Sequence, residues 1–325
     1  MFTDMPEAAL RTFRSAVVAP ADFDEFWSET IAASRQAAQP AVFTALATPL
    51  SSVDVHDVQF SGFGGEPVRA WLIVPVGADP AHPMPAVVEY LGYGGGRGNP
   101  IAHLAYASAG FAHLVMDSRG QGSGRLQAAG ATADPHGSPP AFPGVMTKGI
   151  GHRDSYYFRR LITDAVLAVD AVAQLPFVNA TRIGVVGGSQ GGALSLAVAG
   201  LRDDIAAAVA FVPFLSDIVR ATTITNENPY AEIANYLATQ RDQVDAVTQT
   251  LAYFDGVNFA RRASAPAWYS VALMDAICPP STVFASYNDY AGPKHIQVWP
   301  YNGHEGGAIE DRAQALEIFA EVLRG

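Results

Sequence analysis

A serine flanked by glycines at both second-neighbour positions is the feature that most limits how this chain can fold. The segment Gly187-Gly188-Ser189-Gln190-Gly191 follows an apolar run, 183–186, that is typical of a buried strand. G-x-S-x-G at a strand end is typical of the sharp strand-to-helix turn called a nucleophile elbow, in which larger side chains at the glycine positions would collide. The small residues of 192–199 favour a following helix, whose free N–H groups would stabilise negative charge beside Ser189. The pattern by itself also fits an ordinary glycine-rich turn, so its context has to decide.

Short apolar runs along the chain predict a mostly parallel sheet. Two of them, 53–60 and 68–76, flank a glycine-rich turn and predict an antiparallel hairpin. The others are continuously apolar, as strands buried on both faces are; they are 84–91, 111–118, 182–189, 205–214, 265–273 and 294–301. The clearest helix between them is 154–174, where apolar residues recur at three- and four-residue spacing. We expect one α/β domain over 1–325, with eight strands in the order of an α/β-hydrolase sheet and helices on both faces.

Three segments lie outside this sheet. Residues 1–50 are expected to form an N-terminal helical extension, with a helix beginning near Phe23. Residues 122–150 are rich in Gly, Pro and Ala and predict a long loop excursion. Residues 215–262 predict a helical flap between the sixth and seventh predicted strands, with its clearest helix at 230–237. Either the excursion or the flap could cover a site at the carboxyl ends of the strands.

Composition argues against several classes of partner and cofactor. The formal charge of -11, the isoelectric point near 5.1 and the lack of any basic block argue against nucleic-acid binding. The first residues do not resemble a signal peptide and no apolar run approaches bilayer length, so we expect a cytoplasmic protein with no membrane partner. The single cysteine, Cys278, leaves no Cys/His set for zinc or an iron–sulfur cluster, and we interpret it as a buried apolar residue rather than a reactive thiol. We expect no metal and no cofactor.

The order of acid and histidine supports a catalytic interpretation of Ser189. Asp275 comes two residues after the seventh predicted strand, and His304 follows the last strand within a short turn. The order Ser, Asp, His is that of serine hydrolases on this fold, so we predict a triad of these three residues. Asp255 and Asp289 are alternative acids, but one falls in the flap and the other at the end of the helix after Asp275.

The chemistry assigns a role to each predicted residue. His304 would accept the serine proton during attack on an ester carbonyl and return it to the leaving alcohol, while Asp275 would orient the imidazole. A tetrahedral oxyanion needs two backbone N–H donors. We expect these to be the amides of Gln190, directly after the nucleophile, and of Tyr93, in the glycine-rich loop after the third predicted strand.

Three motifs give the chain a resemblance to a known family. They are Asp117-Ser118-Arg119-Gly120-Gln121-Gly122, Gly187-Gly188-Ser189-Gln190-Gly191-Gly192 and His304-Glu305. With these motifs the chain resembles the acetyl xylan esterase and cephalosporin C deacetylase family, carbohydrate esterase family 7 of the α/β-hydrolases. Further matching segments extend the resemblance over nearly the whole chain; they are 22–27, 253–259, 274–282 and 290–294.

The resemblance implies a serine esterase without a metal. It implies the triad Ser189, Asp275 and His304, with the Tyr93 and Gln190 amides as the oxyanion hole. The implied substrates are acetyl esters of xylose, xylo-oligosaccharides and other small sugars, together with the acetyl group of cephalosporin C. The resemblance also implies a homohexamer, a trimer of dimers whose active sites face an internal cavity.

Less direct matches concern the surroundings of the site. Pro229 and Ile277 match positions that narrow the acyl pocket in the family, which favours acetate. We interpret Arg119 and Gln121 as structural braces near the site rather than as catalytic groups. The segments 147–152 and 227–228 depart from the family pattern, which leaves the leaving-group preference open.

Three other classes share parts of this pattern. A carboxylesterase of broader acyl range would have the same triad. A serine peptidase of the prolyl oligopeptidase type would usually carry a propeller, and this chain has no repeat of blade length. A non-catalytic binding protein on the same fold would be expected to have lost a triad member, and all three candidates are present.

Overall fold

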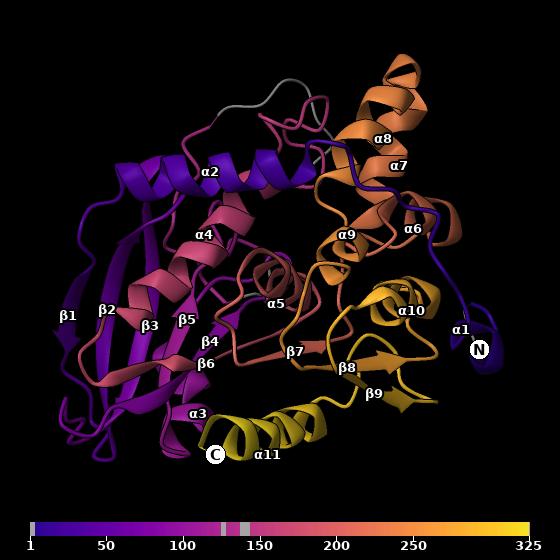
Figure 1. Ribbon diagram of the computed structural model, residues 1–325. Helices are drawn as coiled ribbons and strands as arrows, with labels where there is room; N and C mark the ends of the chain where they lie inside the picture. Colours follow the sequence, from indigo (N-terminus) through magenta and orange to yellow (C-terminus); the bar gives the residue numbers. More distant parts are fainter. Residues whose placement is uncertain (1–3, 125–127, 137–143, 325) are drawn as a thin grey trace.

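One mixed β-sheet runs through the computed structural model, which describes residues 4–124, 128–136 and 144–324 (Figure 1). Its strands are β1 (Val42–Leu46), β2 (Val53–Ser61), β3 (Pro67–Pro75), β4 (Met84–Tyr90), β5 (Ala112–Met116), β6 (Val178–Gly188), β7 (Ala207–Phe211), β8 (Ala267–Ala272) and β9 (Lys294–Trp299). They are arranged in the order β1-β2-β3-β5-β4-β6-β7-β8-β9. The pairs from β1 to β5 along this order are antiparallel, and all the others are parallel. The α/β-hydrolase fold expected from the sequence is therefore confirmed.

The sheet has nine strands, one more than predicted. The additional strand, β1, lies within the segment that was expected to be helical. Four of its five residues are exposed, since it forms the sheet edge and pairs only with β2. Only Phe43 of β1 is partly buried and packs against the core, so this edge strand leaves no alternating core-facing pattern in the sequence.

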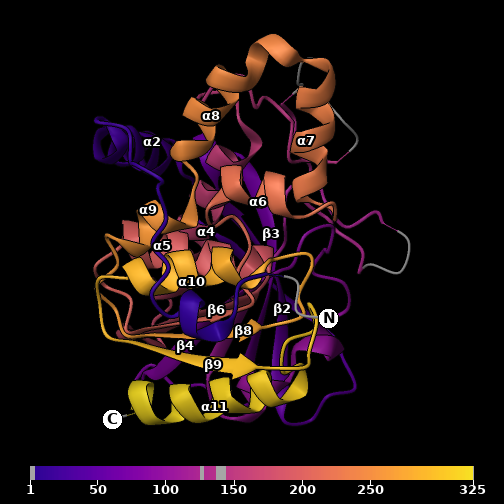
Figure 2. The ribbon, with the colours of Figure 1, turned by 90° about the vertical axis from the view of Figure 1, so that its right-hand side faces the viewer.

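Helices cover both faces of the sheet (Figures 1 and 2). They are α1 (Glu7–Leu10), α2 (Phe23–Ala37), α3 (Ala105–Ser108), α4 (Tyr157–Ala173), α5 (Gln190–Leu201), α6 (Ile218–Ile224), α7 (Tyr230–Thr239), α8 (Val244–Ala252), α9 (Gly256–Ala260), α10 (Pro280–Asp289) and α11 (Ile309–Arg324). Helices α2, α4, α5, α9 and α10 lie on one side of the sheet, and α3 and α11 on the other. None of the helices in the described ranges is both long and apolar enough to cross a membrane.

Burial on both sides explains the continuously apolar strands. All five residues of β5 are buried, and β7 is buried at four of five positions. On one face, Leu161 and Ala165 of α4 belong to the larger core cluster. On the other face, Phe319 of α11 packs in a smaller cluster with Val87 and Val186 of the central strands. Apolar surface removed from water on both faces is what stabilises this layered architecture.

The excursion and the flap differ in regularity. The described parts of 122–150 contain no helix or strand, and 125–127 and 137–143 of that prediction lie outside the described residues. The segment 215–262 carries α6, α7, α8 and α9 between β7 and β8. Helices α7 and α8 project farthest from the sheet (Figure 2). The division of the chain into one domain with these additions stays a prediction.

Candidate active site

Ser189 occupies a sharp turn between β6 and α5. Its backbone has φ 56° and ψ −117°, a conformation that residues other than glycine rarely adopt. Two hydrogen bonds hold the turn: Ser189 N–H donates to Phe211 O at 2.8 Å, and Phe214 N–H donates to Ser189 O at 3.0 Å. The end of β7 therefore fixes the serine backbone at the carboxyl edge of the sheet.

The glycines of the elbow are required by close backbone contacts. A Cβ atom on Gly187 would lie 2.4 Å from the carbonyl carbon of Gly191, and one on Gly191 would lie 2.1 Å from Tyr90 O. Neither backbone can give way without shifting a central strand or α5. This is the steric reason expected from the G-x-S-x-G pattern.

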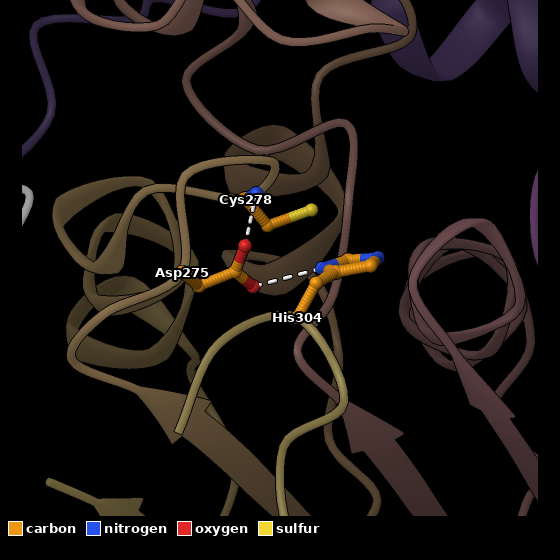
Figure 3. A group of neighbouring side chains, drawn as sticks. All are labelled: Asp275, Cys278 and His304. Carbon is orange, nitrogen blue, oxygen red and sulfur yellow. Dashed lines mark hydrogen bonds and ion pairs between the residues drawn. The ribbon is translucent and has the colours of Figure 1, made fainter. Parts of the chain in front are cut away.

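His304 and Asp275 form a directed pair beside the elbow (Figure 3). His304 Nδ1 lies 2.8 Å from Asp275 Oδ2, and the Asp275 side chain is fully buried. The other carboxylate oxygen, Oδ1, accepts from the backbone N–H groups of Ile277 at 2.8 Å and Cys278 at 2.9 Å. The carboxylate is thus held from both sides, and a hydrogen bond from Nδ1–H leaves Nε2 of the ring as the acceptor nitrogen.

Cys278 lies against the same residues but has the properties of a buried thiol. Burial, and secondarily the negative charge of Asp275, raises the pKa of the Cys278 thiol well above its usual value, although a hydrogen bond with the Ser189 hydroxyl opposes this. A thiol kept protonated is a poor nucleophile. Asp275, Cys278 and His304 also bring one ligand atom each within 4.8 Å of one another, a grouping that could hold a metal ion and that recurs nowhere else in the described ranges.

Ser189 and His304 line one cavity of about 890 Å³. Its wall also includes Tyr93, Pro229 and Ile277, so the structure brings the predicted pocket residues together with the serine and the histidine. Among the described residues, no hydrogen bond joins the Ser189 hydroxyl to His304. Catalytic hydrogen bonds are often long in a protein without substrate, so this geometry is compatible with proton transfer.

The two predicted oxyanion donors are unengaged backbone groups. Neither the Tyr93 N–H nor the Gln190 N–H donates to any residue that the structure describes. The Gln190 side chain is buried and donates from Nε2 to Leu91 O at 3.1 Å. The Tyr93 hydroxyl donates to Glu232 Oε1 and accepts from Val145 N–H, both at 2.7 Å. Side chains therefore anchor both the loop that carries Tyr93 and the start of α5 at Gln190.

Arg119 and Gln121 contact protein groups and do not line the cavity. The fully buried Arg119 guanidinium forms an ion pair with Asp164 at 2.6 Å. Gln121 Oε1 accepts from Gly94 N–H at 2.6 Å, and Gln121 Nε2 donates to Gln190 Oε1 at 2.9 Å. Gln121 thus connects the loop that carries Tyr93 to the residue after the nucleophile.

Neither alternative acid contacts His304. Asp255 is buried in the flap and accepts from the backbone N–H groups of Ile218 at 2.8 Å and Val257 at 3.0 Å. Asp289 forms an ion pair with Arg261 at 2.6 Å. Both act as local structural acceptors.

Glu232 is a buried group near the site that the sequence did not reveal. It is 4% exposed, and burial raises its pKa, while hydrogen bonds from the Tyr93 hydroxyl and Met146 N–H oppose that rise. A glutamate in the first turn of a flap helix has no pattern that separates it from a solvent-exposed one. Only the fold shows that it anchors Tyr93.

Comparison with known proteins decides the family. The sequence profile of the acetyl xylan esterase (AXE1) family matches residues 1–321. The chain belongs to the acetyl xylan esterase family. This membership, expected from the resemblance, places it among the carboxylic ester hydrolases.

Solved structures of two acetyl xylan esterases are similar to this family member over almost their whole length. The enzyme from Paenibacillus sp. R4 has a TM-score of 0.91 and 37% identity, covering 98% of this chain and 100% of that one. Acetyl xylan esterase 1 from Thermoanaerobacterium sp. JW/SL YS485 has a TM-score of 0.88 and 33% identity, covering 97% and 99%. A prolyl endopeptidase structure, at 19% identity and a TM-score of 0.63, shares the fold alone.

A curated relative is similar over part of its length. The acetyl esterase Axe7A of Xylanibacter ruminicola is 33% identical over 179 residues, which is 55% of this chain. The match covers 40% of that protein, so the chain spans less than half the length of this relative.

Proposed function

We propose that this chain removes acetyl groups from small acetylated sugars and xylo-oligosaccharides, and from cephalosporin C, through a triad of Ser189, Asp275 and His304. The observation that carries the proposal is the hydrogen bond from His304 Nδ1 to the buried Asp275, in a histidine that lines one cavity with the elbow serine. The two similar solved structures are acetyl xylan esterases, which supports an acetylated xylan-derived substrate. The cephalosporin substrate rests on the family resemblance.

Acyl transfer follows from the positions of these groups. His304 Nε2 takes the proton as Ser189 Oγ attacks the acetyl carbonyl carbon, and Asp275 stabilises the imidazolium that forms. The carbonyl oxygen becomes an oxyanion that accepts from the Tyr93 and Gln190 N–H groups. His304 then protonates the leaving alkoxide as the ester C–O bond breaks, which leaves an acetyl-serine. A water molecule, deprotonated by His304, attacks this ester, and the proton returns to Ser189 as acetate leaves.

Selectivity for acetate is assigned to the acyl side of the cavity. Pro229 and Ile277 line the cavity with Ser189, and we propose that they limit the length of the acyl chain. Gln121 is proposed to act indirectly, because it holds Gly94 and Gln190 and thereby the two oxyanion donors.

The test compares initial hydrolysis rates of 4-nitrophenyl acetate, butyrate and octanoate by the wild type and Ser189→Ala. We expect a steep fall beyond acetate and no turnover by the variant. Ser195→Ala is the matched control, because it removes a buried hydroxyl from the same helix, where it bonds only the Gly191 carbonyl among described groups. Turnover retained by a folded Ser189→Ala protein would refute the triad. Rates that stay equal or rise with chain length would favour a carboxylesterase of broader acyl range.

The homohexamer stays a prediction of the resemblance. Its test is the mass of the protein in solution, and a monomeric mass would overturn it.

A further inference from the structure

A carboxylate and two histidines lie in the cavity away from the proposed triad. Glu89 is on β4, and its Oε2 atom lies 3.3 Å from His103 Nδ1 and 3.0 Å from His113 Nε2. All three residues line the same cavity as Ser189 and His304. The acyl-transfer steps described above use none of them.

The remaining nitrogens of both imidazoles also face oxygen acceptors. His103 Nε2 lies 3.1 Å from Arg97 O, and His113 Nδ1 lies 2.9 Å from His103 O. These contacts with backbone oxygens fix the position of both imidazole rings beside Glu89.

Glu89 is held as a carboxylate by these neighbours. Burial alone would raise its pKa, but the hydrogen bonds and charges of His103 and His113 hold the pKa of Glu89 well below its usual range. Both histidine contacts go to Oε2. The second oxygen, Oε1, accepts no hydrogen bond from the described residues, and the side chain is 19% exposed in the cavity wall. The result is an ionised acceptor in the cavity wall whose Oε1 atom has no partner among the described residues.

The position of Glu89 fits the alcohol part of an ester. Glu89 is paired with Val186 of β6, and Ser189 comes three residues later, directly after the end of that strand. At the rise of a β-strand this is roughly 10 Å, a span that can hold one or two sugar rings beside the reacting carbonyl. Arg312 and Asp311, at the start of α11, line the same region and add further polar groups.

We infer that Glu89 determines specificity for the leaving group, with Oε1 accepting hydrogen bonds from free hydroxyl groups of the acetylated alcohol. This inference rests on the proposed function, since it concerns the alcohol side of that same site. A hydroxyl group is the donor expected at Oε1, because the free hydroxyl groups of the sugar are the hydrogen-bond donors that the substrates of the proposed function carry on their alcohol side. Glu89 contacts no reacting atom in this arrangement and acts on substrate selection.

The test uses two esters of one sugar with Glu89→Gln. A monoacetate of methyl β-xylopyranoside keeps free hydroxyl groups, whereas the triacetate has none. In the variant the amide oxygen can still accept from the histidines, which places an amide NH2 group where Oε1 stood. We expect the ratio of kcat/KM for the monoacetate to that for the triacetate to fall about ten-fold or more, mainly through KM, as expected when a hydrogen bond to a charged group is lost.

Glu310→Gln is the matched control, since it removes one negative charge at an exposed position of α11 that does not line the cavity. An equal loss on both esters with Glu89→Gln would overturn the inference and leave Glu89 a structural group. If Glu89→Gln lowered the hydrolysis of acetylcholine more than the hydrolysis of the monoacetate, the inference would be overturned in favour of a cation site. Either result leaves the proposed function standing, because that function is tested separately, by turnover in Ser189→Ala and by the dependence of the rate on acyl-chain length.

Discussion

Tyr93→Phe tests whether a single hydroxyl holds the oxyanion loop in place. This hydroxyl joins three segments, since Tyr93 is in the loop after β4, Glu232 is in the flap helix α7, and Val145 belongs to the excursion. Phenylalanine fits the same space and removes only the oxygen. The substitution therefore leaves a buried carboxyl and a buried N–H group without a shared partner.

The loss of stability can be worked from the two contacts. A hydrogen bond to a charged group contributes about 1.5–3 kcal/mol, and a buried donor without a partner costs about 1–3 kcal/mol. Glu232 is 4% exposed and Val145 is 6% exposed, so water cannot readily replace the hydroxyl. We expect the free energy of unfolding to fall by about 2.5–6 kcal/mol at pH 8.

The penalty should depend on pH with a defined sign. Burial raises the pKa of Glu232 in the folded protein, and the hydrogen bond from Tyr93 opposes that rise. Without the hydroxyl the folded-state pKa rises further, so the folded variant binds a proton at a higher pH than the wild type does. Protonation relieves the buried charge, so the difference in unfolding free energy should be smaller at pH 5 than at pH 8.

Urea unfolding at the two pH values measures the stability, and turnover of 4-nitrophenyl acetate measures the effect on the site. Because the Tyr93 N–H is displaced rather than removed, we expect kcat to fall about 10-fold, less than the 100-fold or more that loss of an oxyanion donor costs. Tyr236→Phe on the same helix is the control, since its hydroxyl bonds no described residue. A Tyr93→Phe loss below about 0.5 kcal/mol, or one that grows on acidification, would refute the reasoning.

Three further outcomes follow from buried carboxyl groups. Asp275→Asn should lower kcat about 10⁴-fold with the circular dichroism spectrum unchanged, because the imidazole loses its orienting acceptor; a loss under 10-fold would exclude Asp275 as the triad acid. Asp164→Asn removes the fully buried carboxylate partner of Arg119 and leaves the guanidinium paired only with Glu66 and Asp134, so it should cost about 1.5–3 kcal/mol in urea unfolding, and a neutral effect would contradict that ion pair. Burial raises the pKa of Asp255 to about 7 in the folded protein. Between the unfolded-state pKa and pH 7 the folded wild type therefore binds a proton that the unfolded chain releases, and its stability falls as the pH rises through this range. Asp255→Asn should lack this loss, so its stability relative to the wild type should rise by roughly 3 kcal/mol between pH 4 and 7, and a constant difference would argue against the raised pKa.

Local rules made the fold and the proposed triad predictable. The elbow depends on steric contacts among neighbouring residues, and the places of Asp275 and His304 depend on the order of strands. The end of β7 was less predictable, because the apolar run 205–214 continues past the strand. The structure ends β7 at Phe211, and Val212 turns into the cavity wall with φ 40°.

Groups that meet only in the folded chain could not be found from the sequence. Glu89 and His113 lie on neighbouring strands, β4 and β5, and His103 reaches them from the connection between these strands. Glu232 meets Tyr93 across 139 residues of sequence. No spacing rule links such positions, because the sheet order and the placement of the flap bring them together.

The backbone conformation of Ser189 has a consequence for how this protein could change under selection. Holding a residue other than glycine at φ 56° and ψ −117° lowers the free energy of unfolding by on the order of 1–3 kcal/mol, whereas glycine adopts such a conformation freely. Ser189→Gly is therefore expected to yield a protein more resistant to heat and urea that has lost its nucleophile. A selection for more stable variants that measured only resistance to unfolding would enrich this inactive protein. Any such selection therefore has to measure turnover in every round.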